Sequence, residues 1–316
     1  DIFLYDQKVL ESNGTVGPPP YAAPLINAGA NVRYNDSSAI QRYNAVELML
    51  AEKAYHGLDL QASYTWSRCM SNSLGYFGQY GDEEGIGQSQ TGGGYFFFQN
   101  EYNPMADYGR CISDIAQDVQ GYVVYDLPFG KGRQFASNAN SAVNAVIGGW
   151  QLATDFTFHS GFAINPSAPD VSGTGSYDSR PDCVSGAANN GSKAFESFGA
   201  SVGLQYLNPG AVALPSSGTF GNCEVGALRG PGLKTDDLNL TKKINFTERV
   251  NLQFMTQFIN LTNTPIFGAP SGYCGPQCNG QIQTGANGGN TGAGNFGFAQ
   301  SMDPGRQIQF GLKINY

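Results

Sequence analysis

The sequence is poor in charge, in histidine and in long apolar runs. Charged residues make up 13% of its 316 positions, about half of the ~25% that is usual in soluble domains, and only two residues are histidine. No apolar run approaches the roughly 18 residues of a membrane-spanning helix, which excludes a helical membrane protein. The net charge is -8 and there is no basic stripe, so nucleic acid is disfavoured as a partner.

Glycine and aromatic residues are abundant instead. Glycine occupies 43 of the 316 positions, about twice its usual ~7% share, without the G-X-Y period of collagen. Aromatic residues make up 12%, which argues against wholesale disorder. Because the low charge also disfavours many solvated amphipathic helices, the composition predicts an all-β chain with long loops rich in Gly, Asn and Ser.

Alternation of apolar and polar residues is the strongest pattern in the chain. In residues 58–67 the apolar side chains take every second position, which places them on one face of a strand and the polar ones on the other. Residues 307–316 alternate in the same way. Seven strands are predicted, around residues 43–55, 58–67, 119–127, 150–164, 238–244, 250–258 and 308–316.

The connections between these strands alternate between short and long. Tight turns at 55–57 and 245–249 and a modest link at 130–149 alternate with long loops at 69–117, about 163–235, and 262–305. Long loops on one side and short turns on the other are typical of outer-membrane barrels, whereas loops beyond ~15 residues are uncommon in compact soluble domains. The predicted fold is all-β: an antiparallel transmembrane β-barrel segment of about seven to eight strands with long extracellular loops.

The direction of the first predicted strand, at residues 43–55, bears on the domain organisation. This strand runs towards the short-turn side, so residues 1–42 are predicted to be an extracellular loop or a truncated preceding strand. Residues 43–316 are then the C-terminal portion of the barrel. Because single-chain bacterial barrels have even strand numbers, seven strands favour a truncated chain; the alternative is that residues 2–10 form an eighth strand and close a small barrel.

Two charged residues interrupt the apolar side of the predicted strands. Glu52 and Lys242 share the parity of their apolar neighbours. A charge that faces lipid costs roughly 2–4 kcal/mol at the bilayer midplane but only ~0–1 kcal/mol near an interface. Both residues lie close to a short turn, so they are predicted either to reach the lower headgroups or to follow a β-bulge that changes their side.

All six cysteines lie in the long loops, two in each loop. Although six cysteines allow many pairings, this distribution favours one disulfide within each loop, and disulfides persist in oxidising compartments. A zinc site is disfavoured because the chain has only two histidines, so no metal ligand and no cofactor are predicted. The predicted disulfides join Cys69 to Cys111, Cys183 to Cys223, and Cys274 to Cys278.

One predicted strand carries a short polar set that includes a histidine. Asp155, Thr157 and His159 share the polar side of the strand at 150–164. Ser160 has the opposite parity, so the Ser–His hydrogen bond of a hydrolase is not expected. These three residues are predicted to be lumen-facing polar residues, and no catalytic residue is predicted.

The first long loop carries acidic residues and an aromatic run. Residues 82–84, together with Glu101, Asp107 and Asp114, are candidate Ca²⁺ ligands, but they lack the alternating spacing and positioned glycine of a calcium loop. A solvated acidic loop is predicted instead. For the aromatic run at 95–98 two interpretations stay open, ligand contact and simple loop packing.

Several segments, in order along about residues 40–316, resemble the Oar-like TonB-dependent receptors of the Acidobacteria type. Each segment is short, and the ordered set is the specific feature. The segments are RYNAVEL at 42–48, ASYTWS at 62–67, DLPFGKGR at 126–133, GGWQL at 148–152, LRGPG at 228–232, TERVNLQF at 247–254, NLTN at 260–263 and RQIQFGLK at 306–313.

This resemblance implies a transporter of the outer membrane and not an enzyme. The family has a barrel of about 22 strands with an N-terminal plug and imports large or scarce ligands through the TonB complex. The implied partners are outer-membrane lipid, the TonB complex, an unidentified ligand, and the barrel-assembly machinery. That machinery would read a C-terminal signal made by Phe310, Leu312, Ile314 and Tyr316. The alternative is a secreted β-rich adhesin, or a surface structural or binding module, with disulfide-pinned loops.

Overall fold

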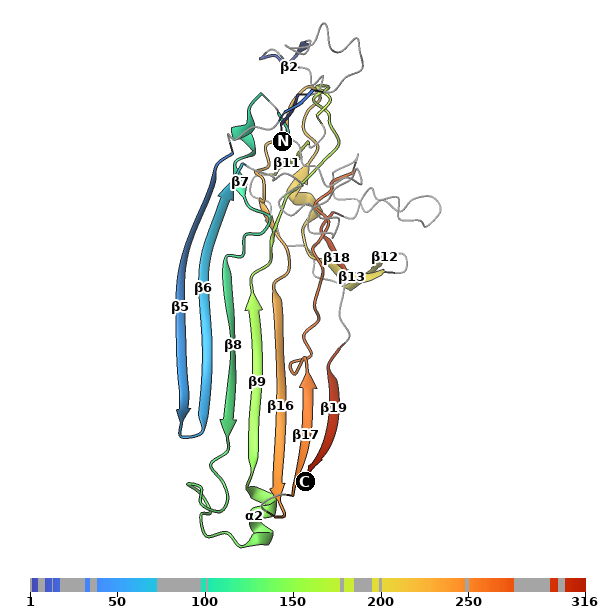
Figure 1. Cartoon of the computed structure of the whole chain (residues 1–316). Coiled ribbons are helices and arrows are strands. Elements are labelled where there is room, and N and C mark those ends of the chain that lie inside the picture. The colour runs from blue at the N-terminus through green and yellow to red at the C-terminus, as the bar shows by residue number, and fades with distance from the viewer. Residues whose placement is uncertain are drawn as a thin grey trace.

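An antiparallel sheet dominates the computed structural model, which describes residues 2–4, 9–12, 14–17, 32–34, 39–72, 98–100, 102–176, 179–184, 195–198, 201–247, 250–275, 296–300 and 305–316. The order across the sheet is β19-β17-β16-β9-β8-β6-β5, so each long strand pairs with the next one along the chain, and the short β7 pairs beside β6 (Figure 1). All seven predicted strands are present. Their bounds are β5 (Gln41–Tyr55), β6 (Leu58–Ser71), β8 (Gln117–Asp126), β9 (Trp150–His159), β16 (Leu233–Asn245), β17 (Asn251–Ile259) and β19 (Gln307–Asn315), and the additional β7 spans Gly109–Arg110.

The register of the sheet places mostly apolar side chains on one face and mostly polar side chains on the other. Residues directly opposite each other on neighbouring strands lie on the same face. The face that carries Leu58 and Phe310 is here called the apolar face, and the opposite one the polar face. One row on the apolar face contains Leu58, Tyr125, Leu152, Leu240, Thr256 and Phe310. One row on the polar face contains Ser63, Gln120, Thr157 and Thr235.

The short connections lie together at one end of the sheet, here called the short-turn end. β5 and β6 are joined by His56 and Gly57, both with positive φ, a conformation that glycine adopts without strain. The link from β8 to β9 contains helix α2 (Ser141–Ile147), which the sequence did not predict. Glu52 is paired with Leu60, and the register shift comes only after Glu52, so the bulge does not turn its side chain away from the apolar face.

The N-terminal residues and the long connections form small sheets of their own at the opposite end, here called the long-loop end (Figure 1). The pairs are β1 (Ile2–Leu4) with β4 (Val32–Tyr34), β2 (Val9–Leu10) with β3 (Val16–Gly17), β10 (Ala163–Ile164) with β15 (Leu228–Arg229), and β11 (Asp182–Cys183) with β14 (Val212–Ala213); β12 (Phe195–Phe198), β13 (Ser201–Gln205) and β18 (Phe298–Gln300) form a three-stranded sheet. Two 3-10 turns, η1 (Pro104–Asp107) and η2 (Pro209–Ala211), lie in the same connections.

Two expectations from the sequence are wrong in this region. The strand predicted to reach residue 164 ends at His159, and residues 163–164 belong to the separate short strand β10. Between them Gly161 packs directly against the carbonyl oxygen of Gly230, where no larger residue fits. Residues 2–4 and 9–10 pair with nearby segments of the N-terminal region and not with the main sheet. The alternative in which residues 2–10 close a small barrel is therefore not found.

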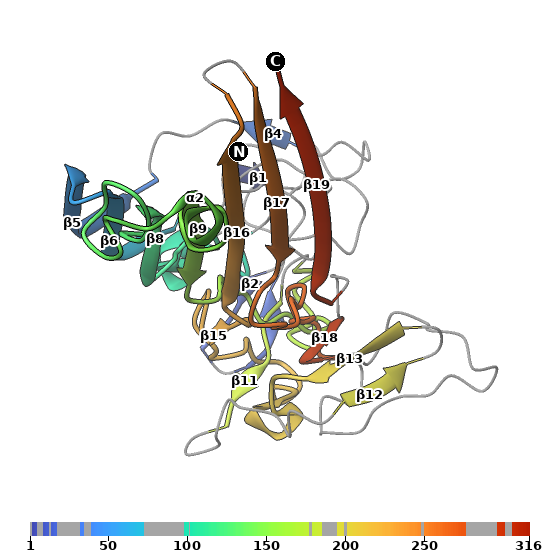
Figure 2. The same cartoon turned by 90° about the horizontal axis from the view of Figure 1, so that it is seen from below.

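The main sheet is open. β5 and β19 stand at its two ends, and among the described residues no strand pairs with the outer edge of either. The view from below shows the two edge strands well apart (Figure 2). Within the described ranges, no helix is long and apolar enough to cross a membrane.

Candidate functional site

The long connections fold together into a compact unit at the long-loop end, here called the loop core. Its buried apolar cluster joins residues from the second long loop to residues from the third. Close approach of the backbone helps the segments pack: at Gly221 a side chain would collide with the carbonyl oxygen of Arg180. The cluster consists of Ile164, Ala168, Leu207, Val212, Cys223, Leu228, Cys274 and Phe296.

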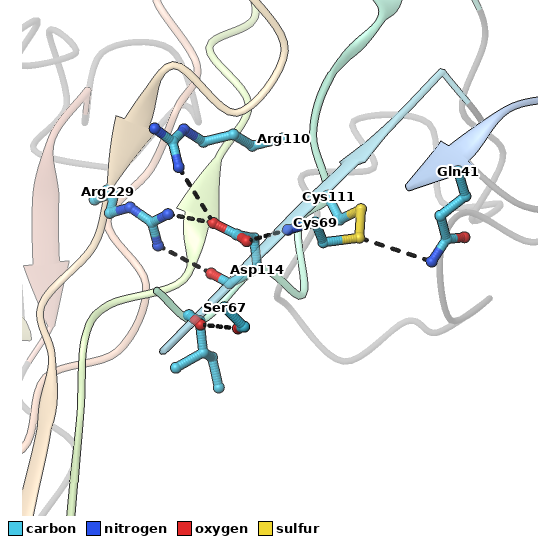
Figure 3. The surroundings of a disulfide bond; sticks show 8 residues. Gln41, Ser67, Cys69, Arg110, Cys111, Asp114 and Arg229 are labelled. Atoms are coloured by element: carbon cyan, nitrogen blue, oxygen red, sulfur yellow. Dashed lines mark hydrogen bonds and ion pairs between the residues drawn. A yellow bond between two sulfur atoms is a disulfide. The ribbon is translucent and has the colours of Figure 1, made fainter. Parts of the chain in front are cut away.

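Asp114 connects the first long loop to the second and to the end of β6 (Figure 3). Its side chain is fully buried and forms ion pairs with Arg229 and, at 3.4 Å, with Arg110. Its Oδ1 accepts a hydrogen bond from the backbone N–H of Cys69 at 2.6 Å. Arg229 also donates from Nη1 to the carbonyl oxygens of Asp114 and Gly161, each at 2.9 Å. One carboxylate thus holds three segments together.

A second buried ion pair joins the first and second loops between Asp107 and Arg180. The two side chains are only 1% and 5% exposed. Asp107 also accepts from the backbone N–H of Gln99 at 2.9 Å, and Arg180 donates from Nε to the carbonyl oxygen of Cys223 at 2.8 Å. Burial raises the pKa of Asp107, and the charge of Arg180 opposes that shift.

These contacts correct the prediction of a solvated acidic loop for two of its members. Asp107 and Asp114 are buried and neutralised by arginines from another loop, because a buried carboxylate is stable only when it is paired and hydrogen-bonded. Glu101 and residues 82–84 and 95–97 lie outside the described residues. In the sequence nothing marks Arg180 and Arg229 as the partners.

Disulfides add covalent links to the loop core. Cys69 is bonded to Cys111 and Cys183 to Cys223, as predicted, with Cα–Cα distances of 5.4 Å and 4.8 Å. Cys274 is also disulfide-bonded, and its predicted partner Cys278 lies outside the described residues. The Cys69–Cys111 bond lies beside Asp114 (Figure 3), so a disulfide and a hydrogen bond to a carboxylate hold the same loop to the same strand end.

Asp155, Thr157 and His159 lie on the polar face of β9. Asp155 is opposite Tyr122 and Asp237, and His159 is opposite Asp118. The ring Nδ1 of His159 lies 2.8 Å from the carbonyl oxygen of Ser160, while Ser160 Oγ accepts from the backbone N–H of Gln117. The three predicted residues therefore share one face, and His159 lies where β9 meets the loop core. Their role in lining a lumen stays a prediction.

The residues of the predicted C-terminal signal line the outer strand of the sheet. Phe310, Leu312 and Ile314 lie on the apolar face of β19 and are 61–72% exposed, and Tyr316, which follows the strand, is 99% exposed. Their opposite neighbours on β17 are Thr256, Phe254 and Leu252. The structure thus presents three apolar side chains in a row at an accessible edge; their reading by assembly machinery stays a prediction.

Lys242 lies on the apolar face but does not expose its charge there. Its Nζ donates to the carbonyl oxygens of Val146, at 3.1 Å, and Gly148, at the C-terminal end of α2. It also lies over the ring of Trp150, 5.1 Å from the centroid. The partial negative charge of a helix C-terminus and the face of an indole ring both attract a cation. Lys242 was predicted either to reach the lower headgroups or to follow a β-bulge. Neither explanation holds, because the C-terminal end of α2 covers the charge.

Replacing Lys242 with methionine is expected to loosen the junction between α2 and the sheet. The variant loses two charge-assisted hydrogen bonds and the contact with Trp150, so we expect the free energy of unfolding to fall by about 1–3 kcal/mol. Urea unfolding followed by tryptophan fluorescence measures the change. Lys243→Met is the matched control, because Lys243 is on the polar face and exposed; equal losses in the two variants would contradict this role of Lys242.

Comparison with known proteins agrees with the two-faced sheet. The chain matches the family described as outer membrane beta barrel domain over residues 6–309. It matches no curated protein and no solved structure. The match covers nearly the whole chain, and it accounts for a meandering sheet with one apolar and one polar face. The chain belongs to the family of outer-membrane β-barrel domains, and its location is the outer membrane.

Proposed function

We propose that this chain is a barrel portion of a TonB-dependent receptor, which takes up a ligand across the outer membrane and is not an enzyme. The observation that carries the proposal is the loop core. The three long connections, which alternation places on one side of the sheet, are held together in two ways. Buried ion pairs join the first to the second, and a buried apolar cluster joins the second to the third. A disulfide closes each of the first two connections. A fixed arrangement of loops reduces the entropy that ligand binding costs, so this unit suits recognition at the cell surface.

The two faces of the sheet support the placement of the chain in a transporter. The apolar face would contact membrane lipid, and the polar face would line the interior, as in barrels whose strands alternate apolar-out and polar-in. Asp155, Thr157 and His159 would then be interior polar groups below the loop core. The ligand is unidentified: an oligosaccharide, a peptide and a siderophore each fit polar loops of this kind.

The open edges of the sheet support a larger barrel. A strand edge in hydrocarbon leaves backbone N–H and C=O groups without partners, and each such group costs several kcal/mol. β5 and β19 therefore need further strands on their outer sides in a membrane. A barrel of about 22 strands, as in the receptors that the sequence resembles, supplies them.

Four partners follow from the proposal. They are outer-membrane lipid at the apolar face, the ligand at the loop core, the TonB complex, and the barrel-assembly machinery at the C-terminal residues. A surface adhesin is the rival function, since disulfide-pinned loops also suit a structural module. The two differ in one property, because an adhesin binds without consuming the energy of the inner membrane.

Uptake by living cells tests the proposal. The gene is deleted from its host and restored in full length, and both strains are given a labelled maltooligosaccharide, an oligopeptide and a ferric siderophore. We expect the restored strain to accumulate at least one of these probes faster, and a protonophore to abolish the difference. TonB is also expected to be crosslinked to the protein in the cell. Surface binding that resists the protonophore, with no accumulation and no crosslink to TonB, would support the adhesin and overturn the receptor.

A further inference from the structure

Helix α2 presents apolar side chains at the short-turn end of the sheet. Its seven residues, SAVNAVI, carry no charge, and Val143 and Val146 are 45% and 69% exposed. Residues three positions apart lie on the same side of a helix, so the two valines form one apolar stripe. Two exposed valines alone would not imply a binding partner. The place where the helix is attached to the sheet does imply one.

The C-terminal end of α2 is bound to the apolar face of the sheet. The indole Nε1 of Trp150 donates to the carbonyl oxygen of Val146 at 2.9 Å, and Lys242 donates to the carbonyl oxygens of Val146 and Gly148. Trp150 and Lys242 are opposite each other on β9 and β16, in the register of the apolar rows. The helix is therefore fixed to the side of the sheet that an outer-membrane barrel turns to lipid.

The point of attachment lies within the apolar band and not below it. Lys242 has Leu240 on one side and Ile244 on the other along the same face of β16. Ile244 lies two residues closer to the short-turn end, which is about 7 Å along a strand. It is opposite Leu252, which in turn is opposite the exposed Ile314. The sheet is thus still apolar at a level beyond the contact with α2.

We propose that α2 is an interfacial helix that lies in the periplasmic leaflet of the outer membrane, with Val143 and Val146 among the phospholipid acyl chains. The occupant of its exposed side is phospholipid, because the helix continues a face that is itself lipid-facing. Lys242 and Trp150 hold the helix in place. This arrangement also keeps a lysine charge out of hydrocarbon, since Lys242 is only 6% exposed beneath the helix. The proposal rests on the membership of this chain in the outer-membrane barrel family and does not depend on ligand uptake.

Site-directed spin labelling tests this placement in the full-length protein. A nitroxide is attached at Val146→Cys, and at Asn138→Cys as the matched control, an exposed polar position in the same connection. The protein is reconstituted in vesicles of phosphatidylethanolamine and phosphatidylglycerol, and heat-modifiable gel mobility confirms that each variant is folded. Oxygen concentrates in the acyl region, whereas nickel ethylenediaminediacetate stays in water. We expect the ratio of oxygen to nickel accessibility to be several-fold higher at position 146 than at position 138.

Two further variants decide the remaining outcomes. Val143→Cys repeats the measurement on the same stripe, so a folding defect at position 146 does not end the test. If folded protein gives the aqueous ratio of position 138 at both valine positions, the helix is not in the membrane and the proposal is overturned. Adding Lys242→Met to Val146→Cys should shift the ratio towards water; an unchanged ratio would overturn the holding role of Lys242.

Discussion

Replacing Asp114 with alanine is expected to lower the free energy of unfolding of the loop core by about 3–5 kcal/mol, which is the usual cost of removing one partner of a buried ion pair. The Asp114 side chain is fully buried, and the Arg229 side chain is only 28% exposed, so the guanidinium keeps its charge without its carboxylate. The backbone N–H of Cys69 loses its acceptor as well. Resistance of the folded protein to limited proteolysis, titrated with urea, measures the loss in the loops.

Two control variants separate charge from shape. Asp114→Asn keeps the volume and can still accept from Cys69, so its loss should be smaller than that of alanine. Glu224→Gln removes an exposed carboxylate from the same loop core and should change stability by less than about 0.5 kcal/mol. Equal proteolysis of Asp114→Ala and the unaltered protein would contradict the role of Asp114 as the link between loops.

A lysine at position 48 is expected to destabilise the folded protein in a membrane by about 2–4 kcal/mol, the cost of a cation on the lipid face at the bilayer midplane. Leu48 is at the centre of the 15-residue β5, on the apolar face, opposite Tyr64. It is already 61% exposed, so the substitution removes little packing within the chain. Urea titration in phospholipid vesicles measures the loss, and heat-modifiable gel mobility reports the folded fraction.

The neighbouring residue provides the control for this prediction. Met49 is 73% exposed, but it lies on the polar face, opposite Ser63. Met49→Lys should therefore cost less than about 1 kcal/mol, as do most surface substitutions. A similar loss in the two variants would show that the two faces of β5 do not differ in their surroundings, and the assignment of the apolar face to lipid would fail.

Most of the main sheet was predictable because its pattern is local. A strand alternates its side chains with a period of two residues, so a segment such as 58–67 reveals its two faces without knowledge of its neighbours. Alternation also excludes a slip of the pairing by one residue, which would mix the faces, but the register itself comes from the structure. The two described disulfides were predictable for a similar reason: each joins cysteines of one predicted loop, 42 and 40 residues apart.

The loop core was not predictable in its details. The ion pairs join residues 73 and 115 positions apart, Asp107 with Arg180 and Asp114 with Arg229. In the sequence an aspartate in a glycine-rich loop looks the same whether it is solvated or buried. Helix α2 was missed because its seven residues are too few to show a helical period. The one sign of it in the sequence was Lys242, a charged residue at an apolar position of its strand.

Alternation and turn spacing are encoded between near neighbours, so they are enough to specify a two-faced antiparallel sheet with long connections at one end. The tertiary structure alone decided which charges are buried, how the long connections join, and what covers Lys242. These features depend on contacts between segments far apart in the chain, and burial and charge pairing are properties of such contacts and not of any single segment.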